Sequence, residues 1–137
     1  MFDDIEKHIR IFLSIQRRPT RNALAGRGSG RNARSDTVTR MFAEDAATYT
    51  NRVYHFHDKG RRIELKEIID VIFEVLRAMP DEILKRYADK LGLITQPAID
   101  EIAAQIHLAL SQKWAISYHP STQPLPPSSY VPSQPRK

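Results

Sequence analysis

The segment from Ile63 to Met79 places the strongest limit on how this chain can fold. Nine of its first fourteen residues are aliphatic or aromatic, and its acidic residues recur three or four positions apart, at Glu64, Glu67, Asp70 and Glu74. In a helix, that spacing gathers the acids on one narrow strip and leaves most of the circumference apolar. The run is also too long for a single strand. We therefore predict a helix at the centre of a helical bundle.

Apolar residues at helical spacing predict further helices on both sides of this segment. Proline and small polar residues mark their ends, since Pro19 stops the first helix and Ser35 or Asp36 caps the second. These helices are expected over about residues 2–16, 36–57, 80–91 and 95–118. The predicted fold is all-α, a compact bundle of four to five helices forming a single domain over residues 1–119.

An arginine-rich and glycine-rich segment interrupts the helical pattern after the first helix. Residues 17–35 have no apolar period, and Gly26, Gly28 and Gly30 alternate with Arg, Ser and Asn. Such a composition buries too little apolar surface to offset the entropy lost on ordering. We therefore predict a mobile basic arm here, with at most a short turn around Leu24.

The last eighteen residues differ in composition from the rest of the chain. Residues 120–137 contain six prolines among small and polar residues, which is typical of an extended, disordered tail. A polyproline segment can dock in a groove lined by aromatic side chains. The candidate partner-binding residues are Pro124, Pro126, Pro127 and Tyr130. A terminus without any partner is the simpler interpretation of the same composition.

The positive charge of the chain is concentrated in the arm. The sequence has 21 basic and 16 acidic residues, a formal charge of +5. Six arginines and no acidic residue lie between Arg17 and Arg34, and the remaining positions hold 15 basic and 16 acidic residues. Charge gathered in one segment indicates a polyanionic partner better than a uniformly basic surface does.

The first hypothesis for function is nucleic-acid binding by a small, non-catalytic accessory protein. A guanidinium can donate to two phosphate oxygens, and each phosphate contact releases counterions. Binding would be largely independent of base sequence, because the arm holds no group placed to read bases and no aromatic ring for stacking. The candidate residues are Arg17, Arg18, Arg21, Arg27, Arg31 and Arg34, with Lys59, Arg61 and Arg62 as a second basic cluster.

Two other interpretations of the arm stay open. Its arginines could bind an acidic protein or lipid surface, or they could simply be solvated. The second hypothesis for function is therefore a protein–protein adaptor or a structural subunit of a larger assembly. In that case the arm and tail become ordered on neighbouring subunits, or on further copies of the chain, and the apolar segment 63–79 contributes to an interface.

Several classes of function lack the residues they need. There is no cysteine, and no glycine pattern typical of a nucleophile elbow, a Walker loop or a dinucleotide site, so we expect neither an enzyme nor a cofactor. No run approaches the ~18 apolar residues of a membrane span, and the acidic N-terminus does not resemble a secretory signal. We expect a soluble, cytoplasmic protein that does not bind membranes.

His55 and His57 have a spacing that requires separate consideration. Two histidines two positions apart cannot share a helix face, although both could bind a metal from an extended segment. A third ligand would have to come from His8, Asp58, His107 or His119, and the sequence does not fix which. Because the context that a metal site requires is missing, we interpret the two as partly exposed histidines at a helix end and predict no metal site.

Overall fold

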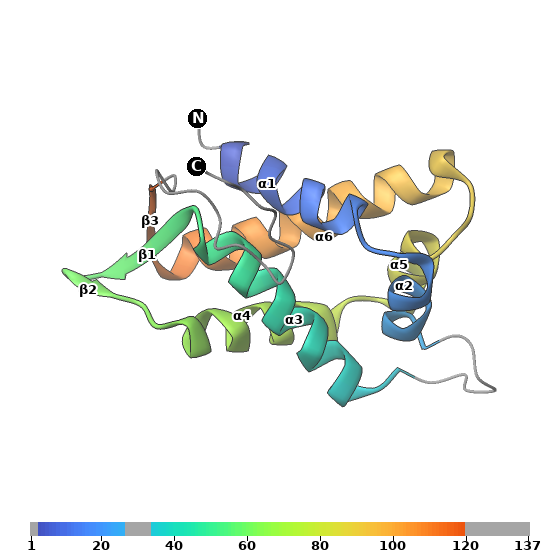
Figure 1. Ribbon diagram of the computed structural model, residues 1–137, viewed down its shortest axis with the longest axis horizontal. Coiled ribbons are helices and arrows are strands. Elements are labelled where there is room, and N and C mark those ends of the chain that lie inside the picture. The colour runs from blue at the N-terminus through green and yellow to red at the C-terminus, as the bar shows by residue number, and fades with distance from the viewer. Residues whose placement is uncertain (1–2, 27–33, 120–137) are drawn as a thin grey trace, which may run out of the picture.

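The computed structural model describes residues 3–26 and 34–119 and is mostly helical, as predicted (Figure 1). The described part of the chain forms six helices and a small three-stranded sheet. In chain order the elements are α1 (Asp3–Ser14), α2 (Arg18–Leu24), α3 (Asp36–Asn51), β1 (Tyr54–Asp58), β2 (Arg61–Arg62), α4 (Leu65–Ala78), α5 (Asp81–Tyr87), α6 (Gly92–Lys113) and β3 (Ala115–Tyr118).

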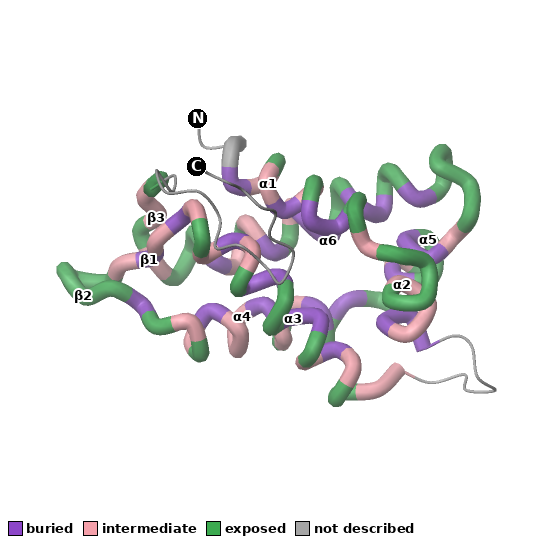
Figure 2. The backbone as a smooth tube through the Cα atoms, viewed as in Figure 1, coloured by how far each residue is buried: buried purple, intermediate pink, exposed green. Residues whose placement is uncertain are grey.

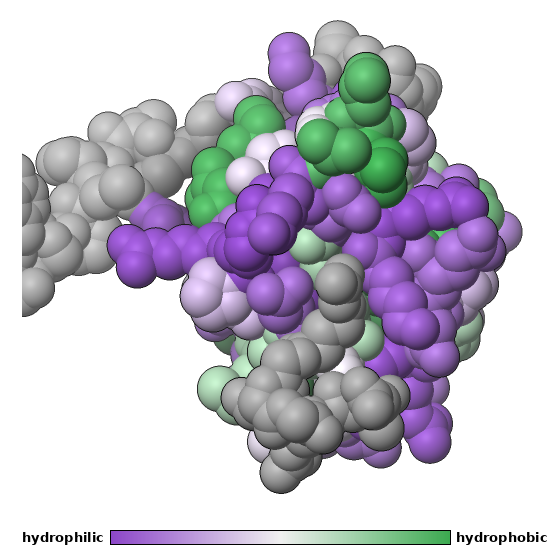
Figure 3. Space-filling view, turned by 90° about the vertical axis from the view of Figure 1, so that its right-hand side faces the viewer, coloured by the Kyte–Doolittle hydropathy of each residue, from purple (hydrophilic) through white to green (hydrophobic). Residues whose placement is uncertain are grey.

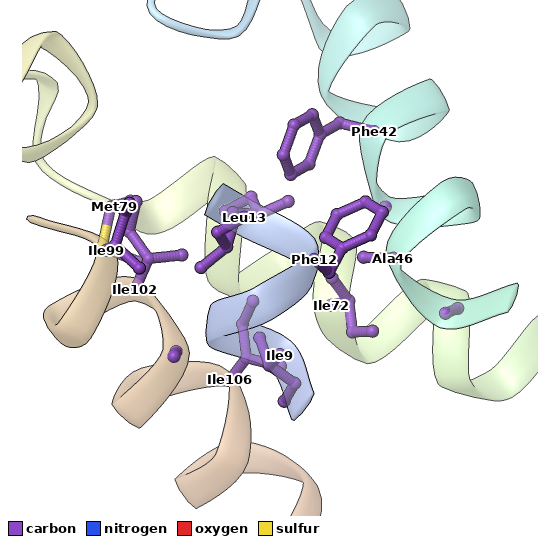
Figure 4. Packing of buried hydrophobic residues seen from close by; sticks show 14 of the residues in the cluster. Ile9, Phe12, Leu13, Phe42, Ala46, Ile72, Met79, Ile99, Ile102 and Ile106 are labelled. Atoms are coloured by element: carbon purple, nitrogen blue, oxygen red, sulfur yellow. The ribbon is translucent and has the colours of Figure 1, made fainter. Parts of the chain in front are cut away.

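One continuous apolar core joins the helices. α6 packs against α1, α4 and α5, and α3 packs against α4. Figure 4 shows Ile9 of α1 lying next to Ile106 of α6, and Phe12 of α1 pointing toward Phe42 of α3. α6 buries more residues than any other described helix, between Thr95 and Leu110, so it holds the central position that the sequence assigned to segment 63–79.

α4 occupies the part of segment 63–79 that is helical, and it is less deeply buried than predicted. Ile68, Ile72 and Leu76 are fully buried, which forms one stripe along the helix. Other apolar side chains of α4 are only partly covered, including Val71 and Phe73. α4 therefore lies at the side of the helical layer, with one face on the core.

The small sheet corrects the all-α prediction, since β1 replaces the end of the expected second helix. Tyr54 and Phe56 are buried while His55 and His57 are less buried, so exposure alternates along β1 as in a strand. Lys59 and Gly60 have positive φ angles of 53° and 83°, which make the tight turn into β2. The alternating aromatic and polar residues carried this strand signal in the sequence.

β3 replaces the end of the expected fifth helix and pairs with β1. The sheet order is β2-β1-β3, and both pairings are antiparallel. In the register, His55 lies opposite Ser117 and His57 lies opposite Ala115. The backbone N–H of His119 donates to the carbonyl of Val53 at 2.6 Å, which extends the pairing by one further residue.

α2 corrects the prediction that residues 17–35 form one mobile loop. Pro19 lies in the first turn of α2, where a missing N–H costs nothing. Leu24 and Ala25 are buried and fix this segment to the body. The entropy lost on ordering α2 is offset by the burial of these two residues and by the contacts of the arginines with other helices.

The connection from α5 to α6 also differs from the expected one. α6 begins at Gly92, three residues before the expected start near residue 95, and Pro97 lies inside it. Thr95, inside the first turn of α6, is buried and donates from Oγ1 to the carbonyl of Asp89 at 2.9 Å. Figure 2 shows that this corner of the molecule is exposed.

In the described part of the chain, no helix has the length and apolar content needed to cross a bilayer.

Candidate functional site

The predicted phosphate-binding arginines that the structure describes are placed in two different ways, and Arg21 is the first case. Its guanidinium donates to the carbonyls of Ser14 at 2.8 Å, Gln16 at 3.0 Å and Tyr87 at 3.4 Å, and it lies 4.8 Å from the centre of the Tyr87 ring. These carbonyls lie at the C-terminal ends of α1 and α5, where backbone acceptors lack helical partners. Arg21 therefore joins two helix ends.

Arg34 does the same at the C-terminal end of α4. Its guanidinium donates to the carbonyls of Leu76, Arg77 and Met79 and to the carboxylate of Asp81, the last at 2.8 Å. Only 18% of the Arg34 side chain is exposed. The hydrogen bond from Arg34 holds the pKa of Asp81 below its usual value. A cation is favourable at a helix C-terminus, so Arg34 is placed to stabilise α4.

Arg17 and Arg18 are exposed at the start of α2. Arg18 makes one long contact, from Nη1 to the carbonyl of Ala88 at 3.4 Å. Arg27 and Arg31 lie outside the described residues. Arg17 and Arg18 thus remain accessible to solvent, whereas Arg21 and Arg34 contact the body.

The packing of α2 against α5 adds basic residues that were not among the predicted phosphate-binding residues. Residues 17–25 and 81–91 together contain six basic and three acidic residues. α5 contributes Lys85 and Arg86, the segment after it contributes Lys90, and all three are exposed. We call this the basic end of the molecule. The bases in the last turn of α5 are evident in the sequence, but only tertiary packing places them beside the arm.

The second predicted basic cluster lies elsewhere. Lys59, Arg61 and Arg62 belong to the β1–β2 hairpin, which is at the opposite end of the long axis from α2 (Figure 1). Arg61 pairs with Glu67 at 3.0 Å, and this hydrogen bond lowers the pKa of the Glu67 carboxyl. The arm arginines and this second cluster therefore do not form one continuous surface for binding phosphates.

Apolar side chains lie close to the basic end. Figure 3 shows hydrophilic residues over the middle of this face, with apolar groups above them. Exposed apolar residues at the end of α1 and at the α5–α6 corner include Ile15 at 61%, Leu91 at 62% and Leu93 at 92% exposure. The tail residues Pro124, Pro126, Pro127 and Tyr130 lie outside the described residues.

Three of the five histidines come together on the sheet. The nearest ligand atoms of His55, His57 and His119 all lie within 4.8 Å of one another. The sequence showed the first two as neighbours and could not select the third, because that depends on the pairing of β1 with β3.

Comparisons with known proteins identify no relative. No protein-family model matches the chain, and no curated protein or solved structure is significantly similar to it. Its function therefore has to be inferred from its own residues.

Proposed function

We propose that the chain is a small, non-catalytic accessory protein that binds nucleic-acid phosphates at its basic end, largely independently of base sequence. The packing of α2 against α5 carries this proposal, because it brings Arg17 and Arg18 to the same end as Lys85 and Lys90. Exposed cations gathered at one end attract a polyanion and release its counterions.

The proposal assigns different roles to arginines that look equivalent in the sequence. Arg21 and Arg34 stabilise helix ends, and their guanidinium groups already donate to backbone carbonyls. Arg17 is exposed. Arg27 and Arg31 lie in the glycine-containing part of the sequence between Arg21 and Arg34. We assign the phosphate contacts to these three, with support from Arg18, Lys85 and Lys90.

The test measures binding of a labelled duplex and a labelled single strand over a salt series. The variant carries Arg17→Ser, Arg27→Ser and Arg31→Ser, and it keeps the arginines that cap helices. On duplex DNA, loss of three phosphate contacts should reduce the slope of log affinity against log salt by about 2 to 3. Far-UV circular dichroism checks that the variant is folded.

A matched control removes the same charge from the opposite end, with Lys59→Ser, Arg61→Ser and Arg62→Ser. The proposal expects this control to keep most of the salt dependence of the unaltered chain. It is wrong if the unaltered chain does not bind at low salt, or if the control loses as much affinity as the arm variant.

A second candidate function is an adaptor or structural subunit, and the exposed apolar corner favours it. Leu91 and Leu93 are apolar side chains that remain largely in solvent, and clustered apolar surface is typical of an interface. Self-association through this corner should weaken in a Leu91→Ser, Leu93→Ser variant and persist in Leu108→Ser, which removes an apolar residue that is 57% exposed elsewhere on α6. Sedimentation velocity over a concentration series distinguishes the two outcomes.

A further inference from the structure

The three histidines on the sheet are brought together by strand register. His55 and His57 lie on the face of β1 opposite the buried Tyr54 and Phe56. Ser117 pairs with His55, and His119 lies two residues further along on the same face, beside Val53. Residues more than 60 positions apart in the sequence thus present their imidazoles to one region of the surface.

Ring nitrogens of His57 and His119 lie close to a common atom, the hydroxyl oxygen of Ser117. His57 Nε2 lies 3.1 Å from Ser117 Oγ, and His119 Nε2 lies 3.0 Å from the same oxygen. The rings of His55 and His119 are stacked, with centroids 4.3 Å apart and planes 14° from parallel. The hydroxyl can donate to only one of the two nitrogens, so it accepts from the other, and the cluster holds both kinds of ring nitrogen.

The other two histidines of the chain have partners elsewhere. His8 Nε2 lies 3.2 Å from the carbonyl of Tyr49, and its ring stacks on that tyrosine. His107 Nδ1 lies 3.0 Å from the carboxylate of Glu6. His8 and His107 therefore serve as internal controls. Each has the same imidazole side chain as the cluster but does not lie near a second histidine of it.

Imidazole must be neutral to bind a metal. Burial of the ring, together with the charges of Arg62, His119 and His57, lowers the pKa of His55 from its usual value. His55 and His57 are partly buried, and His119 is exposed, so an ion can approach from solvent.

We propose that His55, His57 and His119 together bind one divalent late transition-metal ion of the Zn²⁺, Ni²⁺ or Cu²⁺ type. Imidazole nitrogen suits these ions, and three protein ligands leave a coordination position for water. The ion would link β1 to β3 and so fasten the end of the described chain to the body.

Binding requires a local adjustment of the rings. With metal–nitrogen bonds of about 2.0 to 2.1 Å, ligands in a tetrahedral site lie about 3.3 Å apart. The nitrogens are separated by up to 4.8 Å, so the stacked rings must turn to direct their lone pairs at one point. Arg62 lies across the hairpin from His57 and adds positive charge nearby. We therefore expect micromolar rather than nanomolar affinity.

The experiment titrates the full chain, without an affinity tag, with Zn²⁺ in a calorimeter. We expect one ion per chain, and a loss of about tenfold or more in affinity for each of His55→Asn, His57→Asn and His119→Asn. The matched controls are His8→Asn and His107→Asn, which should bind like the unaltered chain. Thermal unfolding with and without Zn²⁺ gives a second readout, because binding to the folded state raises Tm.

Three results would overturn the proposal: no heat above the buffer blank, more than one ion of similar affinity per chain, or equal losses in the control variants. Far-UV circular dichroism of each asparagine variant separates loss of the site from loss of the fold. Nucleic-acid binding is measured separately, so the metal site and the basic end can fail independently.

Discussion

Tyr87 shows how one buried polar group joins three helices. Its hydroxyl donates to the carbonyl of Leu13 at 2.8 Å, its own carbonyl accepts from Arg21, and its ring is completely buried. Replacement by phenylalanine keeps the ring and deprives the Leu13 carbonyl of this donor. We expect Tyr87→Phe to lower the free energy of unfolding by about 1 to 2 kcal/mol in urea denaturation.

The pH dependence of the same residue gives a separate prediction. Burial raises the pKa of Tyr87 above its usual 10.0. The folded state then holds the proton more tightly than the unfolded state, so the contribution to stability is fully present below about pH 10 and decreases as pH rises. We expect the free energy of unfolding to fall more steeply above pH 10 in the unaltered chain than in Tyr87→Phe. Equal pH profiles would contradict this.

Arg34 gives a test of helix capping by a distant guanidinium. Lysine keeps the charge, but its single ammonium cannot reproduce a fork that contacts three carbonyls and Asp81. We expect Arg34→Lys to cost about 1 to 3 kcal/mol, because hydrogen bonds to a charged group are lost. The control is Arg61→Lys, whose pair with Glu67 is exposed and screened by solvent, so this change should cost less stability than Arg34→Lys. Similar losses in both variants would refute the capping role.

The arginines also show what the sequence could predict at this scale. Composition identified all six arm arginines as a group, and Arg17 and Arg18 are exposed as expected. It could not separate them from Arg21 and Arg34, because the carbonyls that these two bind lie up to 66 residues away in the chain. Most of the acceptors are backbone carbonyls at helix ends, and the pattern of side chains in the sequence does not indicate which carbonyls an arginine will reach.

At the scale of elements, the turn between β1 and β2 depends on Gly60. Its φ angle is +83°, and an added Cβ would meet no atom within 4 Å, so the cost of a side chain is purely conformational. We expect Gly60→Ala to lower stability by about 1 kcal/mol. Gly92 is the matched control, since it begins α6 with equally open space and without that φ angle. Gly92→Ala should be neutral or stabilising by up to about 1 kcal/mol in the same denaturation assay.

Helices were easier to predict than strands for a physical reason. The structure confirms the five expected helices as α1, α3, α4, α5 and α6, apart from their ends. β1 and β3 were assigned to helix ends because each is only four or five residues long. Their stability comes from pairing with each other across about 60 residues, which helical periodicity cannot reveal.

At the scale of the whole molecule, the surface residues could be predicted but their arrangement could not. The sequence identified two basic clusters and one pair of histidines. Folding places the clusters at opposite ends of the long axis and brings His119 to the pair (Figure 1). Both outcomes depend on the antiparallel packing of α1 on α6 and of β1 on β3, which is set by the core as a whole.

Because one core connects both ends, the chain should unfold as a single unit. Trp114, the only tryptophan, lies beside Phe56 at the sheet, while Leu13 is fully buried toward the other end. We expect Leu13→Ala to cost about 2 to 5 kcal/mol. The urea midpoints from Trp114 fluorescence and from far-UV circular dichroism should move together, as two-state unfolding requires.

The exposed Ile15 provides the control for that experiment. Its side chain is 61% exposed, so Ile15→Ala should change the free energy of unfolding by no more than about 0.5 kcal/mol. If Leu13→Ala shifts the dichroism midpoint and leaves the fluorescence midpoint in place, the sheet end is stable without the helical end. In that case a metal bound at the sheet would stabilise only the sheet end against unfolding. If the chain unfolds as one unit, the same metal stabilises the basic end as well.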